Sequence, residues 1–260
     1  MNKFLLRALV LASVNIAVFA DAQFRTRNRM DKLEDFDEQK FSWGFYLNGN
    51  RLDYRIVLHP RYGSEGNQNL VKSKESYSFG AGLIAKWRLN DYLDLRLEPG
   101  LQFAQRQLIF DTQSNDQYAA GTLTNPPFTP IPLTDKDKTR DIKSTLVDVP
   151  VLLELHGNRW YNSRPYIAAG VNYIVNLQSN SDSEDDNLQQ VFRSTTHNFA
   201  WSAEMGIQFY FNKFKLTPAI RGTFFMNNEK VADNANTPPY WATAMSTLQT
   251  RAVMFVLKFE

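Results

Sequence analysis

Apolar and polar residues alternate one by one over long stretches of this chain. The stretch LVDVPVLLELH, residues 146–156, carries Asp148, Glu154 and His156 at even positions. Its odd positions are all apolar: Val147, Val149, Val151, Leu153 and Leu155. A repeat of two residues is the period of a β-strand, whose side chains point to opposite faces in turn. The stretch therefore predicts a strand with one apolar face and one face that carries carboxylates.

Eight segments share this period, and no segment shows a convincing helical one. They lie at about residues 41–58, 77–89, 93–106, 146–156, 167–177, 199–211, 214–226 and 253–259. In the first segment the apolar parity changes between Leu47 and Leu52, and we expect a β-bulge at Gly49 and Asn50 to absorb the change. Eight such strands with turn-rich connections predict an all-β barrel or sandwich.

Short and long connections alternate along the chain. The short ones lie at 90–91, 157–163 and 212–213, and the long ones at 60–76, 111–143, 178–196 and 227–246. Tight turns at one rim and long polar loops at the other are typical of an outer-membrane barrel, in which the short turns are periplasmic and the long loops extracellular. The pattern therefore predicts that both ends of the strand region lie on the periplasmic side.

The face opposite the apolar one distinguishes a soluble barrel from a membrane barrel. A soluble barrel alternates as well, but its apolar face points inward and its other face is solvated. Around segment 167–177 the second face carries Tyr166, Ala168, Gly170 and Asn172, which are uncharged and mostly small. Such residues suit the interior of an eight-stranded barrel, which side chains fill almost completely. The apolar face is therefore expected to contact lipid.

Charged residues on the second face are expected to pair inside the barrel. A carboxylate that faced lipid would cost up to a few kcal/mol, whereas an inward one can meet basic groups. The residues of inward parity predict a network that plugs the lumen: Arg96, Glu98, Arg106, Asp148, Glu154, Glu204 and Arg221. Aromatic residues near the strand ends predict the girdles of a membrane barrel: Trp43, Trp87, Tyr92, Trp201, Phe209, Tyr210, Phe211, Phe255 and Phe259. We expect an eight-stranded antiparallel transmembrane β-barrel with a plugged polar lumen and no open pore.

Three prolines fit these strands less well. Pro99 and Pro218 fall on apolar faces and Pro150 on the inward face, and each removes a donor from the ladder of hydrogen bonds. We expect bulges, or strand ends at other positions, near these prolines.

The first residues have the pattern of an export signal. Lys3 and Arg7 precede an apolar run that ends in Ala20-Asp21-Ala22, and Arg7 and Asn15 leave the run short of the ~20 apolar residues of a membrane span. We expect a cleaved signal peptide at 1–22 and a barrel at 41–260. Residues 23–40 are charged throughout and predict a mobile periplasmic leader, with a docking segment for a partner as the alternative.

Composition excludes few classes of protein. The formal charge of +2 falls to zero when Lys3 and Arg7 leave with the signal, which gives no argument for nucleic acid. The chain has no Cys, so packing or a membrane must supply its stability. Its mean hydropathy of −0.41 does not exclude a membrane barrel, because alternating strands average out.

Several segments together resemble a known family. They are FSWGFYLNGN at 41–50, YSFGAGLIAKWRLNDYLDLRLEPGLQF at 77–103, VDVPVLLELH at 147–156, RPYIAAGVNY at 164–173 and the final VLKFE. With the signal and the charged leader, this order is similar to the PorT/SprT family of outer-membrane barrels of Bacteroidetes. The resemblance implies a non-enzymatic component of the type IX secretion and gliding machinery. Its partners would be other membrane or periplasmic subunits of that machinery, along with outer-membrane lipid and lipopolysaccharide.

Candidate chemistry is sparse. The histidines His59, His156 and His197 lack the spacing of a metal site, and no motif predicts a cofactor. The acidic run at 181–186 suits either Ca²⁺ or a solvated loop. A lipid-modifying barrel enzyme is the enzymatic alternative, with His197 near Asp185 and Asp186 as its candidate residues.

A third class is a structural or adhesive barrel that acts through its long loops. Two loops carry proline next to aromatic residues, which would serve as partner contacts: Pro126, Pro127, Phe128, Pro238, Pro239, Tyr240 and Trp241. Proline that only stiffens exposed loops is the other interpretation.

Overall fold

The computed structural model describes residues 32–58, 71–110, 138–183, 191–232, 242 and 245–260. They form one 3-10 helix and ten strands: η1 (Glu34–Glu38), β1 (Phe41–Leu58), β2 (Val71–Lys74), β3 (Ser76–Arg88), β4 (Leu93–Leu97), β5 (Gly100–Phe110), β6 (Thr139–His156), β7 (Ser163–Asn176), β8 (His197–Tyr210), β9 (Lys215–Phe225) and β10 (Met245–Phe259). Within these residues no helix is long and apolar enough to cross a membrane.

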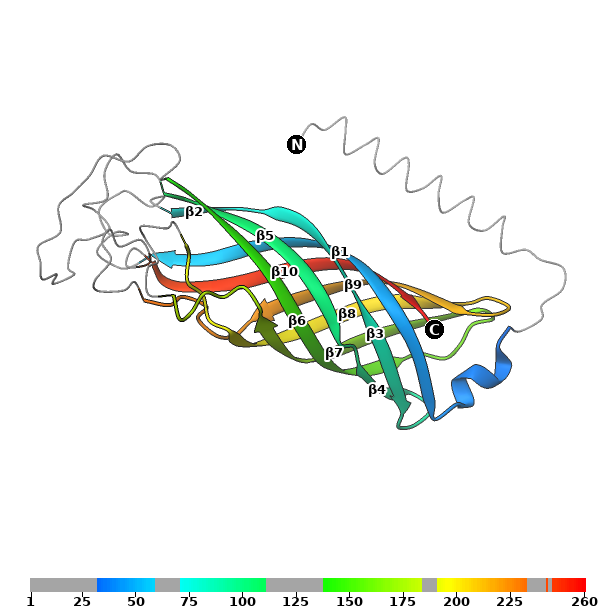
Figure 1. Cartoon of the computed structure of the whole chain (residues 1–260). Coiled ribbons are helices and arrows are strands. Elements are labelled where there is room, and N and C mark those ends of the chain that lie inside the picture. Colours follow the sequence, from blue (N-terminus) through cyan, green and yellow to red (C-terminus); the bar gives the residue numbers. More distant parts are fainter. Residues whose placement is uncertain (1–31, 59–70, 111–137, 184–190, 233–241, 243–244) are drawn as a thin grey trace, which may run out of the picture.

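All strands belong to one antiparallel sheet that closes on itself. Consecutive strands are neighbours in most of the sheet, and β1 pairs with β10 along one edge and with β3 along the other. Figure 1 shows the result, a cylinder of tilted strands. The prediction of an all-β antiparallel fold is confirmed.

The predicted number of eight strands is wrong, because the sheet has ten. At two positions around the cylinder, a short strand and a longer one take the place of a single strand: β2 with β3, and β4 with β5. Glu75 separates β2 from β3, and the Glu98-Pro99 pair separates β4 from β5. Strand β2 also lies within residues 60–76, which the sequence pattern assigns to a loop.

Prolines explain two of the places where the ladders are interrupted. Pro99 lies in the break between β4 and β5, and Pro150 of β6 lies opposite the same break, where its carbonyl accepts a hydrogen bond of 3.2 Å from the Glu98 amide. The β8–β9 pairing stops at Gly206 and resumes at Phe209, opposite Pro218. Each interruption therefore falls where proline has no amide hydrogen to donate.

The two rims of the cylinder differ. At one rim, the turn end, the strands are joined by short segments at 89–92, 157–162 and 211–214. Helix η1 and the C-terminus lie at this rim as well (Figure 1). At the other rim, the loop end, longer connections join the strands. The predicted alternation of short and long connections therefore separates the two rims.

The outward face carries an apolar belt. Side chains of large apolar residues are exposed on every side of the cylinder, for example Trp43 at 73%, Leu83 at 65%, Val171 at 57% and Met205 at 63%. Aromatic rings stack on this surface near both ends of the belt, as Phe41 does on Trp87, Phe45 on Phe259, Phe211 on Phe214 and Trp201 on Phe224. Such a belt with aromatic margins is the surface that a membrane barrel presents to lipid.

Strand β1 has no bulge at Gly49, and that prediction is wrong. The pairing of β1 with β10 is regular from Phe45 to Val57. Leu52 and Tyr54 keep the inward parity of the strand and are 2% and 6% exposed. The apolar parity changes because the two faces exchange character along the strand. Near the loop end the inward face is apolar and the outward face is polar.

Glycine makes room for tyrosine inside the cylinder. Gly82 of β3 lies opposite Tyr46 of β1, and a Cβ at Gly82 would come within 2.5 Å of the Tyr46 ring and of the Pro99 carbonyl oxygen. Gly206 has the same relation to Tyr166, at 2.8 Å. The Tyr46 ring therefore lies over Gly82 of β3, and the Tyr166 ring over Gly206 of β8, where the neighbouring strand has no side chain.

We expect Gly82→Ala to destabilise the folded protein by about 1–3 kcal/mol, because the Tyr46 ring and the backbone must shift. Urea-induced unfolding in lipid vesicles would measure the effect. Gly49→Ala is the matched control, since nothing lies within 4 Å of a Cβ at that position. Equal stability of the two variants would contradict this account of the packing.

Candidate functional site

A network of buried charges fills the half of the interior nearer the turn end. Its cations are Lys86, Arg96, Lys215, Arg221 and Lys258, and its carboxylates are Asp94, Glu98, Glu154, Glu204 and Glu260. Their side chains are at most 8% exposed, and eight of the ten are fully buried. Equal numbers of the two signs make the network neutral as a whole.

Arg221 and Lys258 bind the same two carboxylates at the centre of the network. The Arg221 guanidinium is ion-paired with Glu98 and donates from Nε to Glu204 at 2.7 Å. The Lys258 ammonium lies 2.8 Å from Glu98 and is also paired with Glu204. The Tyr166 hydroxyl donates to Glu204 at 2.7 Å. Each of these two carboxylates is therefore neutralised by more than one donor.

Arg96 connects this centre to the turn end. Its guanidinium pairs with Glu154 and lies 3.2 Å from Glu98 and 3.7 Å from Glu260. Glu154 also accepts a hydrogen bond of 2.6 Å from the Gln208 amide, and Glu260 is 2.8 Å from the Lys215 ammonium. With the Lys86–Asp94 pair, the ion pairs of the network join six strands across the interior: β3, β4, β6, β8, β9 and β10.

Strand register places these side chains together. Glu204 and Arg221 are direct partners in the β8–β9 ladder, and Asp94 and Glu154 are partners in the β4–β6 ladder. A lone buried ion costs several kcal/mol of desolvation, and good pairing can offset this cost. The network therefore depends on the correct register of strands that lie far apart in the sequence.

The structure brings together five of the seven residues that the sequence pattern assigns to the network: Arg96, Glu98, Glu154, Glu204 and Arg221. Asp148 is buried apart from them and accepts a hydrogen bond of 2.8 Å from Asn172. It has no ion pair with any described residue.

Arg106 also lies outside the network, nearer the loop end. Its guanidinium is 4.3 Å from the centre of the Tyr54 ring and donates to Ser144 at 2.9 Å and to Thr250. Thr250 in turn donates to Glu229, just past the end of β9. Burial raises the pKa of Glu229 above its ordinary value, although the charge of Arg106 acts in the opposite direction.

Five charged members of the network are absent from the set predicted from the sequence: Lys86, Asp94, Lys215, Lys258 and Glu260. Each has the inward parity of its strand, so the signal that identified Arg96 and Arg221 was present for these residues as well. Lys86 and Lys258 are each a single charge on an inward face that is otherwise small or apolar, so the pattern of that face does not indicate a charged network.

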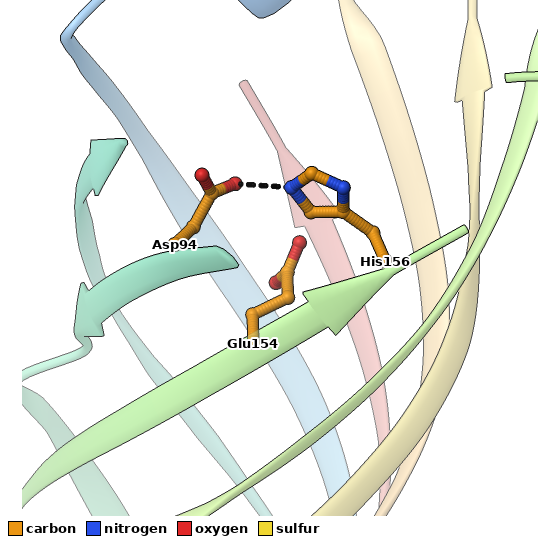
Figure 2. Close-up of side chains that lie close together, drawn as sticks. All are labelled: Asp94, Glu154 and His156. Carbon is orange, nitrogen blue, oxygen red and sulfur yellow. Dashed lines mark hydrogen bonds and ion pairs between the residues drawn. The ribbon is translucent and has the colours of Figure 1, made fainter. Parts of the chain in front are cut away.

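His156 joins a cluster that spacing along the sequence does not show. Figure 2 shows Asp94 from β4 and Glu154 and His156 from β6 converging in the interior. Their nearest ligand atoms lie within 4.8 Å of one another, and His156 Nε2 is 3.1 Å from Asp94 Oδ2. Imidazole and carboxylate are ligands for divalent metals.

The charges around this cluster are already balanced. Lys86 Nζ lies 3.2 Å from Asp94 Oδ2, and Arg96 pairs with Glu154. A divalent cation would have to displace an ammonium group or add to its charge in a buried space. We therefore regard the cluster as the turn-end part of the charge network and assign no metal to it.

Residues just before β1 lie against the turn end. The Tyr210 hydroxyl, which faces inward rather than joining the girdle, donates to Asp37 of η1 at 2.8 Å. Arg159 and Arg164 each lie 3.7 Å from the same carboxylate. The Phe36 ring lies 4.8 Å from the Lys215 ammonium. Residues 32–40 are thus docked on the rim, which differs from the mobile leader that composition predicts.

We expect Asp37→Asn to loosen this docked segment, because the amide keeps the shape of the side chain but loses its charge to Arg159 and Arg164. Trypsin should then cleave folded protein after Lys40 several times faster than in the wild type. Glu38→Gln is the control, since Glu38 is an exposed neighbour with no ion pair to a described residue. Equal cleavage of the two variants would contradict a role of Asp37 in docking.

The other candidate residues do not form a site in the described part of the chain. His197 Nδ1 is 2.8 Å from the Tyr173 hydroxyl on the outer surface. Residues 184–186, which are half of the acidic run at 181–186 and include Asp185 and Asp186, lie outside the described residues, as do the signal at 1–22 and His59. The same holds for all candidate loop contacts: Pro126, Pro127, Phe128, Pro238, Pro239, Tyr240 and Trp241.

Comparisons with known proteins identify the family. Solved structures that match include OprG from Pseudomonas aeruginosa (13% identity, 84% of this chain and 93% of that chain, TM-score 0.36) and the Neisserial surface protein NspA (10%, 85% and 98%, 0.35). The attachment invasion locus protein Ail of Yersinia pestis also matches (8%, 85% and 99%, 0.34). The search of curated proteins found no match. The model of the family described as outer membrane protein beta-barrel domain matches residues 19–230. The chain therefore belongs to this family and is an integral protein of the outer membrane.

Proposed function

We propose that this protein is a closed, non-enzymatic outer-membrane barrel that acts by contacting other proteins of a secretion machine in the cell envelope. The observation that carries the proposal is the burial of the charge network. Arg96, Glu98, Glu154 and Arg221 are fully inaccessible to solvent although they lie in the middle of the cylinder. A continuous water channel would leave such side chains accessible. A closed lumen excludes transport through the barrel and leaves its rims as the working surfaces.

The turn end offers a surface for such contacts. The turn between β6 and β7 carries Trp160 and Tyr161, which are 73% and 46% exposed and whose rings lie 6.1 Å apart. Arg159 of the same turn holds residues 32–33 through its guanidinium. Exposed aromatic residues on a held backbone are typical anchors of protein interfaces. We assign this rim to the periplasm, where subunits of an export machine would reach it.

The resemblance to the PorT/SprT barrels supports the choice of a secretion machine, and type IX secretion is the specific form of the proposal. The enzymatic alternative gains no support from the His156–Asp94 pair, because both side chains are at most 3% exposed. A substrate in the membrane or in water would not reach them. Analysis of lipid A in a deletion strain separates the two classes, since altered acylation with intact secretion would favour the enzyme.

Two measurements test the proposal. Purified protein in planar bilayers should give no sustained current, with a porin in the same bilayers as positive control. Purification from outer membrane in mild detergent should retain envelope proteins that are lost from the Trp160→Ala/Tyr161→Ala variant but kept by Lys213→Gln at the neighbouring turn. Sustained channels would overturn the closed lumen. Identical co-purifying proteins from the two variants would overturn the turn-end interface.

A further inference from the structure

The outward face changes from apolar to charged along one side of the cylinder. On β1 the outward residues are apolar up to Leu47 and charged at Arg51, Asp53 and Arg55. Arg51 lies in register with Tyr77 of β3 and Val253 of β10, which are among the last apolar residues of their strands. The apolar belt therefore ends at one level on these neighbouring strands.

Basic residues predominate just beyond this level. The outward cations there form a set that we name the basic ridge: Arg51, Arg55, Lys72, Lys74, Lys143 and Arg251. They come from β10, β1, β2 and β6, which together with β3 and β5 form a continuous part of the sheet. The outward carboxylates on the same strands and at Glu75 are fewer: Asp53, Glu75 and Asp141. The ridge thus has an excess of positive charge.

The three carboxylates are already engaged. Glu75 is ion-paired with Arg51, Asp53 accepts from the Ser73 hydroxyl at 2.6 Å, and Asp141 accepts from the Gln107 amide at 2.8 Å. By contrast, four members of the ridge have no ion pair with any described residue: Arg55, Lys74, Lys143 and Arg251. These four exposed cations therefore remain available to an anion from outside the described part of the chain.

We propose that the basic ridge binds the phosphate groups of lipopolysaccharide in the outer leaflet. Phosphorylated lipid headgroups lie where an apolar belt meets water, and Lys and Arg near that level attract them. Arginine also binds phosphate through paired hydrogen bonds. The other side of the cylinder has no such ridge among its described residues, because the outward residues near the loop end of β7, β8 and β9 are apolar or aromatic, for example Tyr173, Leu177, Phe199 and Met226. One side of the barrel thus holds the glycolipid.

Binding of purified lipid A to the detergent-solubilised full chain tests this site. Wild-type protein should bind bisphosphorylated lipid A about tenfold or more tightly than the dephosphorylated lipid, and the difference should shrink in high salt. Lys74→Gln/Lys143→Gln should remove about tenfold of the affinity for the phosphorylated lipid. Adding Arg55→Gln and Arg251→Gln should remove the preference for phosphate entirely.

Two lysines at the turn end supply the matched control. Lys40→Gln/Lys213→Gln makes the same change of charge on exposed residues of the opposite rim, and it should leave lipid A binding unchanged. Heat-modifiable migration in gels shows which variants are folded. The comparison of the two lipids uses the wild-type protein alone, so it does not depend on whether a variant folds. Equal affinity for both lipids, equal loss in the control, or competition by inorganic phosphate at the concentration of lipid A would overturn the proposal.

Discussion

Arg221→Met is expected to destabilise the folded barrel by about 3–5 kcal/mol, because it leaves buried carboxylates without their partner. Glu98 and Glu204 would then share only Lys258 and Arg96 among the described cations, one positive charge fewer than in the wild type, in a fully buried space. Methionine fills a similar volume, so the loss of charge dominates the effect. Urea-induced unfolding of protein folded into lipid vesicles, followed by tryptophan fluorescence, measures the change.

Two further variants give this prediction a sharp control. Arg221→Met/Glu204→Gln restores the balance of charge and should recover part of the lost stability. Arg88→Met removes an arginine from the exposed pair with Asp91, whose side chains are 27% and 80% exposed, and should change stability much less. If Arg221→Met were as mild as Arg88→Met, the network would not contribute to the stability of the fold.

Val171→Arg is expected to destabilise the barrel by about 2–4 kcal/mol, because it places a charge in the middle of the apolar belt. Val171 is 57% exposed, and its ladder partners Val151 and Trp201 are outward apolar residues as well. A side chain that faced water at this position would tolerate arginine. The variant therefore tests directly which face contacts lipid, by the same unfolding measurement in vesicles.

The same substitution near the loop end is the matched control. Val57 is 42% exposed and lies on β1 beyond Arg55, opposite Thr247 of β10. Because this level lies past the apolar belt, Val57→Arg should leave stability nearly unchanged. Equal loss in both variants would mean that the belt extends to the loop end, and it would also remove the basis for placing the basic ridge at the lipid headgroups.

Alternation was sufficient to predict much of the interior. It assigned Arg96, Glu98, Glu154, Glu204 and Arg221 to one side of the sheet, and the structure joins these residues by ion pairs. The same rule could have predicted Lys258 and Lys215, because parity depends only on the position of a residue in its strand. Parity does not predict the ion-pair partners, because which carboxylate meets which cation depends on the register of several strands.

Along β1 the apolar residues change from the outward face to the inward face, so parity alone does not predict which face is apolar. The switch of apolar parity between Leu47 and Leu52 predicts a bulge only if the apolar side of the strand always faces outward. The strand instead continues past the lipid, so that its inward residues become the apolar ones near the loop end. Which face of a strand is apolar depends on whether that part of the strand lies within the membrane. The local pattern of residues does not show where the membrane-embedded part ends.

The sequence by itself determined the strand character of the chain, the division of its residues between two faces and the alternation of short turns with long loops, because these follow from periods and turn residues in neighbouring positions. Only the tertiary structure decided the ten strands, the pairing of ions inside the cylinder, the docking of Asp37 and the convergence of Asp94 with His156. These features depend on contacts between residues that are distant in the chain, and closure of the sheet is what brings such residues within reach of one another.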